Sequence, residues 1–151
     1  MYEALTELIP ALEASNFGVW KGGNRLESGF ILFPYVNYSD TVHELIHRVN
    51  DFDVSKIGLT YQTYRDRLHI RGLDKDKRGA DVAALDGPDV FALLLYIVRA
   101  NRFGEGLLMS YLKDGTIIRW LRRLQEIDER MNAYARLILL MSWCERNMKN
   151  G

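Results

Sequence analysis

Cysteine is nearly absent from this chain, since Cys144 is the only one among 151 residues. A single cysteine excludes a disulfide within the chain and a zinc site built from several cysteines. Free cysteines are among the most buried residues in proteins. We therefore expect the Cys144 thiol to be reduced and buried.

Long apolar runs and net charge are also missing. Apolar runs such as Leu137–Met141 are far shorter than the roughly 20 residues of a membrane-spanning helix. Twenty basic and twenty acidic residues cancel, so no overall field would attract nucleic acid or an anionic membrane. The opening residues MYEALTELIPALEAS lack the basic start of a secretory signal. We therefore expect a cytoplasmic protein that has no membrane partner.

What remains is the composition of an ordinary globular domain, 48% hydrophobic and 26% charged. We predict one α+β domain over residues 1–151, mostly α-helical, with a small N-terminal antiparallel β-sheet and a helical C-terminal half. The apolar spacing predicts a helix over 2–15, a well-buried strand in SGFILFPYVNYS and a helix that begins near Thr41. A short helix follows around Tyr61–Leu68, and Gly87-Pro88-Asp89 opens a helix at the centre of the core.

The C-terminal section has a regular apolar spacing of alternating three and four residues, which is typical of a coiled-coil seam. The first six positions are Ile117, Trp120, Leu124, Ile127, Met131 and Tyr134. An unbroken helix from Thr116 to Met148 would be about 50 Å long, much longer than a domain of this size is wide. The helix therefore either breaks near Asn132 and packs back on the core, or extends and pairs with a second copy as a homodimer.

One stretch carries a sharp chemical hypothesis. His43-Glu44-Leu45-Ile46-His47 matches the H-E-x-x-H motif, in which two histidines on one helix face bind zinc and the glutamate acts as the base. Asp53 lies where a third ligand would stand. The alternative is that Thr41 and Glu44 form a capping box and that both histidines lie on a solvated face. The sequence favours this alternative, and hence no cofactor.

Two further sets of charged residues are candidate sites. Arg119, Arg122 and Arg123 could contact the phosphates of a nucleic acid. Ion pairs with Glu126 explain these arginines equally well, so nucleic acid is the less favoured partner. Arg102 and Glu105 lie at a helix junction, where they could bind a small polar ligand. The favoured alternative is that they stabilise the two helix ends.

The segments FGVWKGG, FPYVNYS and VRANRFGEGLLMSYLKDGTIIRWLRRLQEI together resemble a bacterial family of small proteins with a domain of unknown function. The resemblance covers roughly residues 5–128 and leaves a C-terminal helix over 129–149 outside it. The chain departs from the family pattern at Gly104, where a cysteine is expected, and lacks tryptophans near Asp53–Tyr64. The resemblance implies a shared fold, supplies no activity and counts against zinc chemistry.

These observations favour a non-enzymatic interaction or regulatory module that forms a homodimer or binds another protein. A zinc-dependent hydrolase and a nucleic-acid-binding module are the two alternatives.

Overall fold

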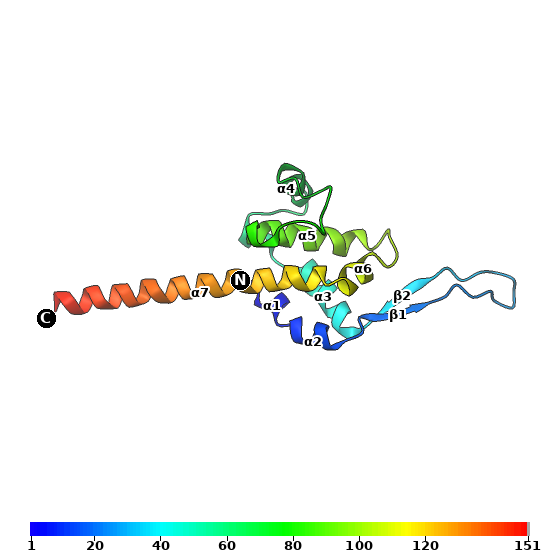
Figure 1. Cartoon of the computed structure of the whole chain (residues 1–151), viewed down its shortest axis with the longest axis horizontal. Helices are drawn as coiled ribbons and strands as arrows, with labels where there is room; N and C mark the ends of the chain where they lie inside the picture. The colour runs from blue at the N-terminus through cyan, green and yellow to red at the C-terminus, as the bar shows by residue number, and fades with distance from the viewer. Residues whose placement is uncertain (151) are drawn as a thin grey trace.

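The order of the helices and strands confirms the mostly helical α+β class (Figure 1). The computed structural model describes residues 1–150. Its elements are α1 (Glu3–Thr6), α2 (Ile9–Ala14), β1 (Gly18–Lys21), β2 (Tyr35–Tyr38), α3 (Asp40–Asp51), a 3-10 turn (Val54–Ile57), α4 (Tyr64–Ile70), a second 3-10 turn (Val82–Ala84), α5 (Gly87–Ala100), α6 (Leu107–Lys113) and α7 (Thr116–Lys149).

Helix α5 forms the centre of the core. Asp86 caps it by accepting a 2.9 Å hydrogen bond from the Asp89 N–H, and Pro88 occupies the first turn, as the sequence predicted. The side chains of residues 90–95 are fully buried, because α3, α4, α6 and α7 pack around this helix. An almost continuous apolar run suits a helix that is covered on all sides.

The N-terminal segment forms two short helices instead of the single helix predicted over 2–15. Pro10 lies in the first turn of α2. Proline has no backbone N–H and clashes with the preceding turn, so a continuous helix through this position is disfavoured. The apolar side chains of both helices still pack into the core.

The two strands form a β-hairpin that extends away from the body of the molecule (Figure 1). They pair antiparallel, from Gly18 opposite Tyr38 to Lys21 opposite Tyr35. The prediction of a well-buried strand was wrong, since Phe30 is 74% exposed and Phe33 is 84% exposed. A two-stranded sheet alone cannot cover its own faces, and no helix lies over this part of the hairpin.

Helix α7 is continuous over 34 residues, so it extends and does not break near Asn132. Pairing with a second copy stays a prediction. Its first half packs on α1, α5 and α6. The last buried residue of α7 is Asp128, whose Oδ2 accepts a 2.7 Å hydrogen bond from the Tyr2 N–H. Every residue from 129 to 150 is exposed, including Cys144. The expectation of a buried thiol was therefore wrong.

Candidate functional site

The HELIH motif lies on α3, but its cap differs from the predicted one. Ser39 caps the helix, and its hydroxyl accepts a 3.3 Å hydrogen bond from the Val42 N–H. Thr41 is therefore inside the helix, and the predicted capping box with Glu44 does not form. Ser and Thr are similar cap residues, so the sequence alone does not decide whether the helix is capped by Ser39 or by Thr41.

The polar side chains of the motif engage neighbours on the surface of the helix. Glu44 accepts a 2.8 Å hydrogen bond from Arg48, and this bond to the arginine lowers the pKa of the glutamate. His47 lies 3.0 Å from Asp51, one turn further along. His43 is exposed, and its ring meets the Tyr38 ring edge-on at 6.4 Å. The two histidines are therefore on the solvated side of α3, as the alternative reading expected.

Asp53 stands outside α3 and caps the following 3-10 turn. Its Oδ1 accepts hydrogen bonds from the Ser55 N–H at 3.2 Å and from the Ser55 hydroxyl at 2.5 Å. Among residues 1–150, no group of three or more His, Cys, Asp or Glu side chains is placed to hold a metal ion. Zinc binding by His43, His47 and Asp53 stays a prediction.

The arginines of α7 are engaged with the body of the protein. Arg119 donates a 3.0 Å hydrogen bond to the carbonyl of Arg78, and Arg122 pairs with Glu13. Arg123 donates to the carbonyl of Leu85 at 3.0 and 3.1 Å. These residues line a shallow cavity of about 400 Å³.

The expected role of Glu126 as an ion-pair partner is confirmed in part. Its carboxylate lies 3.2 Å from Arg123 and 2.8 Å from Arg130, whereas Arg122 pairs with Glu13 on α2 instead. Each of the three arginines therefore has a hydrogen-bond or ion-pair partner within the chain. Binding of phosphate by Arg119, Arg122 and Arg123 was not favoured by the sequence and stays a prediction.

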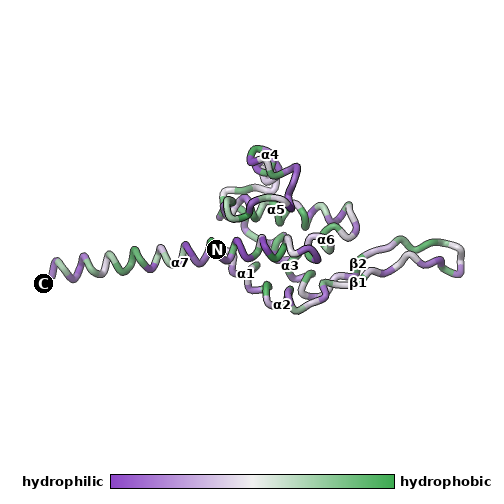
Figure 2. The backbone as a smooth tube through the Cα atoms, in the orientation of Figure 1, coloured by the Kyte–Doolittle hydropathy of each residue, from purple (hydrophilic) through white to green (hydrophobic). Residues whose placement is uncertain are grey.

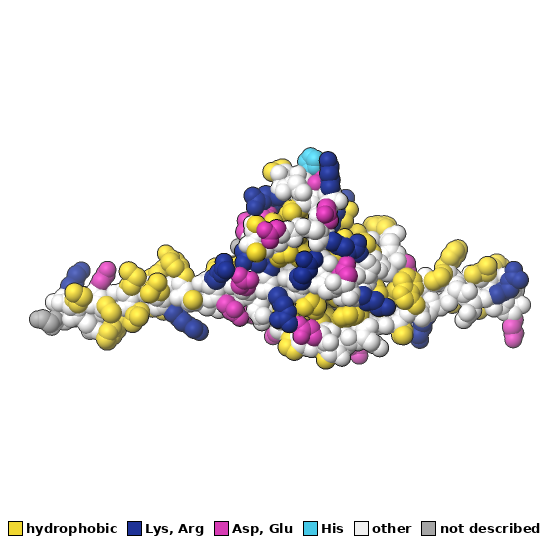
Figure 3. All heavy atoms as spheres, in the orientation of Figure 1, with side chains coloured by type: hydrophobic (Ala, Val, Ile, Leu, Met, Phe, Trp, Pro, Cys, Tyr) yellow, Lys and Arg dark blue, Asp and Glu magenta, His cyan; other side chains and the backbone are white. Residues whose placement is uncertain are grey.

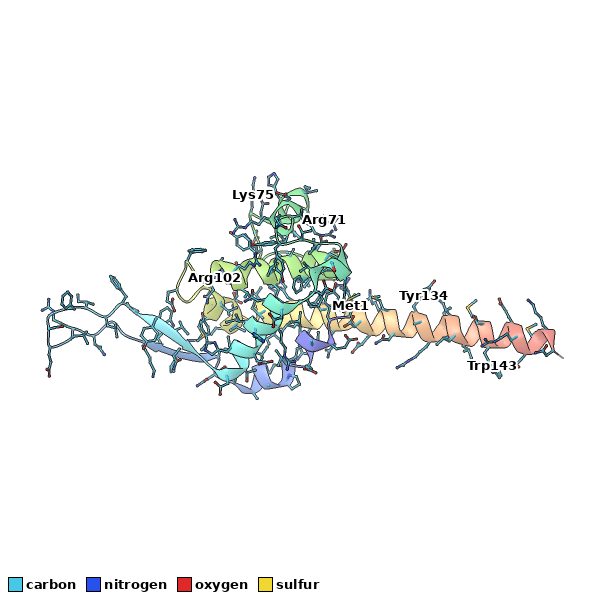
Figure 4. All side chains as sticks on the ribbon, turned by 180° about the vertical axis from the view of Figure 1, so that it is seen from behind. Met1, Arg71, Lys75, Arg102, Tyr134 and Trp143 are labelled. Atoms are coloured by element: carbon cyan, nitrogen blue, oxygen red, sulfur yellow. The ribbon has the colours of Figure 1, made fainter. Side chains whose placement is uncertain are left out.

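The junction between α5 and α6 anchors the base of the hairpin. Glu105 Oε1 accepts a 2.8 Å hydrogen bond from the Val36 N–H of β2, a role that differs from the predicted one at a helix end. Asn101 Oδ1 accepts from the Tyr38 hydroxyl at 3.1 Å and from the Leu108 N–H at 3.0 Å. Arg102 is exposed beside this junction (Figure 4).

Gly106 completes the anchor. It has a left-handed conformation, with φ of 81°, and a Cβ at this position would overlap the ring of Trp20. Glycine is the residue that combines this conformation with so close an approach. The E-G pair of the family pattern therefore acts as a docking point for the hairpin, with Glu105 binding its backbone and Gly106 admitting its tryptophan.

The predicted seam residues divide into two groups. Ile117, Trp120 and Leu124 are fully buried in the core of their own chain, so they are not available to a second copy. Ile127 is partly buried against the core. Met131 is 53% exposed and Tyr134 66% exposed. The spacing was therefore read correctly, but its first half serves the fold.

Two exposed apolar surfaces dominate the molecule, and they lie at opposite ends (Figures 2 and 3). We call residues 129–149 of α7 the projecting helix and residues 18–38 the hairpin arm. Tyr134 and Trp143 leave the projecting helix on opposite sides (Figure 4). The exposed apolar residues of the projecting helix are Met131, Tyr134, Leu137, Ile138, Leu139, Leu140, Met141, Trp143 and Met148. Those of the hairpin arm are Val19, Trp20, Leu26, Phe30, Ile31, Leu32, Phe33 and Tyr35.

The hairpin arm is a candidate interaction surface that the sequence analysis missed. A signal was present, since one apolar strand with a single partner strand leaves two faces to cover. In residues 1–150, none of the helices combines the length and apolar character needed to cross a membrane.

The fold and these surfaces define a small, mostly helical protein with two exposed apolar projections. The chain belongs to a family of unknown function (DUF6508), whose model matches residues 1–130. No curated protein and no solved structure matches the chain. The family match confirms the resemblance read from the sequence and ends where the projecting helix leaves the body.

Proposed function

We propose that this protein is a non-enzymatic interaction module that forms a homodimer in the cytoplasm through its projecting helix. The observation that carries the proposal is the exposure of every residue from 129 to 150 on a helix rich in apolar side chains. Contiguous exposed apolar surface of this kind marks interaction sites on proteins. A helix that is apolar on several sides is normally covered on several sides.

The energetics support self-association. An isolated helix in water gains little stability from its own hydrogen bonds, and packing of its apolar face supplies most of it. The heptad spacing continues through six positions of the projecting helix, from Met131 to Met148, and five of these are apolar. Pairing two copies along these positions would bury on the order of 1,200 Å², which reaches the range of specific protein interfaces.

Sedimentation velocity of the whole chain tests the proposal. We expect a dimer at micromolar concentration. We expect Ile138→Glu to raise the dissociation constant of the dimer at least about tenfold, because burying an unpaired carboxylate would cost about 1.4 kcal/mol or more. Asn132→Glu is the matched control, since it adds the same charge outside the stripe. A parent chain that remains monomeric at 100 times these concentrations would refute the homodimer.

The two alternative functions have direct tests. The zinc content of the parent compared with a His43→Ala, His47→Ala variant reports on the hydrolase, and one equivalent lost in the variant would support it. A nucleic-acid-binding module using Arg119, Arg122 and Arg123 should bind oligonucleotides with an affinity that falls steeply with salt.

A further inference from the structure

We infer that two copies pair their projecting helices antiparallel, with the midpoint of the pairing between Leu139 and Leu140. The inference rests on the proposed self-association and specifies its geometry. It predicts which side chains meet: Met131 of one copy faces Met148 of the other, Tyr134 faces Glu145, and Ile138 faces Met141.

The spacing of the stripe fits this orientation. Its members in the projecting helix are Met131, Tyr134, Ile138, Met141, Glu145 and Met148. The intervals are three, four, three, four and three, so the stripe reads the same from either end. A helix turned end to end therefore meets its partner with every position filled, over about 26 Å.

The helices that pack on the first half of α7 disfavour a parallel pair. Toward the N-terminus of α7, the stripe continues into Ile117, Trp120 and Leu124, which are buried against the body. That side of α7 is already occupied by α1 and α5. A parallel partner helix, followed toward its own body, would run into these helices. An antiparallel partner ends beside Met131, where the body ends.

The only acidic residue of the stripe gives a second argument. In a parallel pair in register, Glu145 would face Glu145 of the other copy, and two like charges would lie together in an apolar seam. In the antiparallel pair, each Glu145 faces Tyr134 of the other copy. The hydroxyl of this tyrosine, which is 66% exposed in the single chain, can donate a hydrogen bond to the carboxylate.

Charge is distributed unevenly along the projecting helix. The root of the projecting helix carries Glu129 beside Arg130, whereas its tip carries Arg146 and Lys149 with Glu145. Parallel pairing would bring the two basic tips together, and antiparallel pairing keeps them apart. The opposite face of the helix is a poorer seam, because Arg136 and Arg146 flank Leu139 and Trp143 there.

Disulfide trapping tests the orientation. Two variants of the whole chain carry Cys144→Ser with either Met131→Cys or Met148→Cys, and each is oxidised alone and as a mixture of both. We expect a cross-linked dimer in the mixture and little in either variant alone. In the antiparallel pair position 131 meets position 148, and like positions are about 26 Å apart, beyond the reach of a disulfide. The substitutions lie outside the core, so the body should remain folded.

The alternative outcomes separate the orientation from the self-association. Cross-linking within each variant alone would show a parallel pair and overturn the inference, while leaving the proposed homodimer in place. No cross-linking in samples that sediment as dimers would place the contact elsewhere and also overturn it. A monomeric parent chain in the same sedimentation experiment would overturn both proposals.

Discussion

Asp89 has a fully buried carboxylate, which needs hydrogen-bond partners within the protein. Arg67 Nε donates to one oxygen at 2.6 Å, and Arg71 approaches the other at 3.0 Å. Arg67 also contacts both oxygens of Asp86 at 2.8 and 2.9 Å. Buried carboxylates are tolerated when such partners are present, so this cluster joins α4 to the start of α5.

Removing one arginine that binds the Asp89 carboxylate should destabilise the folded protein. We predict that Arg67→Ala lowers the free energy of unfolding by about 3 kcal/mol, because the Asp89 carboxylate would stay buried with half of its hydrogen bonds. Urea denaturation measures the change. Lys75→Ala, on an exposed residue near α4, is the control and should change stability by less than about 0.5 kcal/mol. Equal effects of the two substitutions would contradict this account.

The carboxyl groups of Asp86 and Asp114 make the free energy of unfolding depend on pH in the acidic range. Burial disfavours the charged form of Asp86, but the Asp89 N–H and the Arg67 guanidinium outweigh it and lower the pKa. Burial is likewise outweighed at Asp114, whose pKa is lowered by hydrogen bonds from Thr116 and Arg78. A carboxyl with a lower pKa in the folded state stabilises above its unfolded value of about 3.9 and loses this contribution as pH falls through the folded value.

We therefore predict that the contribution of these two groups is constant from pH 7 to about pH 5 and declines below about pH 4. Urea denaturation across this range measures the free energy of unfolding. The Asp86→Asn, Asp114→Asn double variant should show a shallower decline than the parent chain. A decline of the same steepness in both would mean that other groups cause it.

At the scale of elements, the junction between the hairpin arm and α6 offers a matched pair of glycines. Gly106 and Gly115 precede α6 and α7 with nearly identical conformations, at φ of 81° and 82°. A Cβ at Gly106 would overlap Trp20, whereas a Cβ at Gly115 has nothing within 4 Å. Alanine at either position therefore introduces the same backbone strain, but only one variant displaces the hairpin.

We predict that Gly106→Ala destabilises the protein by at least about 1 kcal/mol more than Gly115→Ala. Thermal unfolding gives the comparison. Hydrogen exchange at residues 18–38 should rise in the Gly106 variant alone, because the strand anchor would be lost while the core is kept. Unchanged exchange in this segment would show that Trp20 does not hold the hairpin in place.

Helices α5 and α7 show how much of the fold could be predicted from the sequence. Helix α5 was predicted with its start, because capping and an apolar run are local signals. The heptad spacing of α7 is also a local signal. Whether this spacing serves the core of the chain or an exposed surface depends on the rest of the fold. Trp120 in the core and Tyr134 in solvent share one spacing, because core packing and coiled-coil pairing require the same period.

The candidate sites show the same limit. The exposure of His43 followed from its place on the helical wheel and was predicted. The hydrogen bond that the Val36 N–H donates to Glu105 joins residues 69 positions apart, and no spacing rule predicts such a contact. The exposure of Phe30 and Phe33 depends on how far the hairpin reaches beyond the helices, which is a property of the whole fold.

At the scale of the whole molecule, the core ends before the projecting helix begins. No residue from 129 to 150 is buried, and the family match also ends at residue 130. We predict that a chain truncated after Arg130 folds and sediments as a monomer. Its thermal midpoint should lie within about 3 °C of that of the full-length chain, measured at a concentration low enough for the full-length chain to be monomeric. Calorimetry and sedimentation velocity measure the two properties. A truncated chain that still dimerises would place the interface on the body or the hairpin arm.

The opposite directions of the hairpin arm and the projecting helix have a consequence for what a dimer could hold. Two copies joined at their projecting helices would carry their hairpin arms at the two outer ends, facing away from each other. Such a particle is bivalent: one partner that binds a hairpin weakly would be held much more firmly if it offered two sites at the matching separation. The paired helices between the bodies would set that separation, so the dimer would select partners by the distance between their sites.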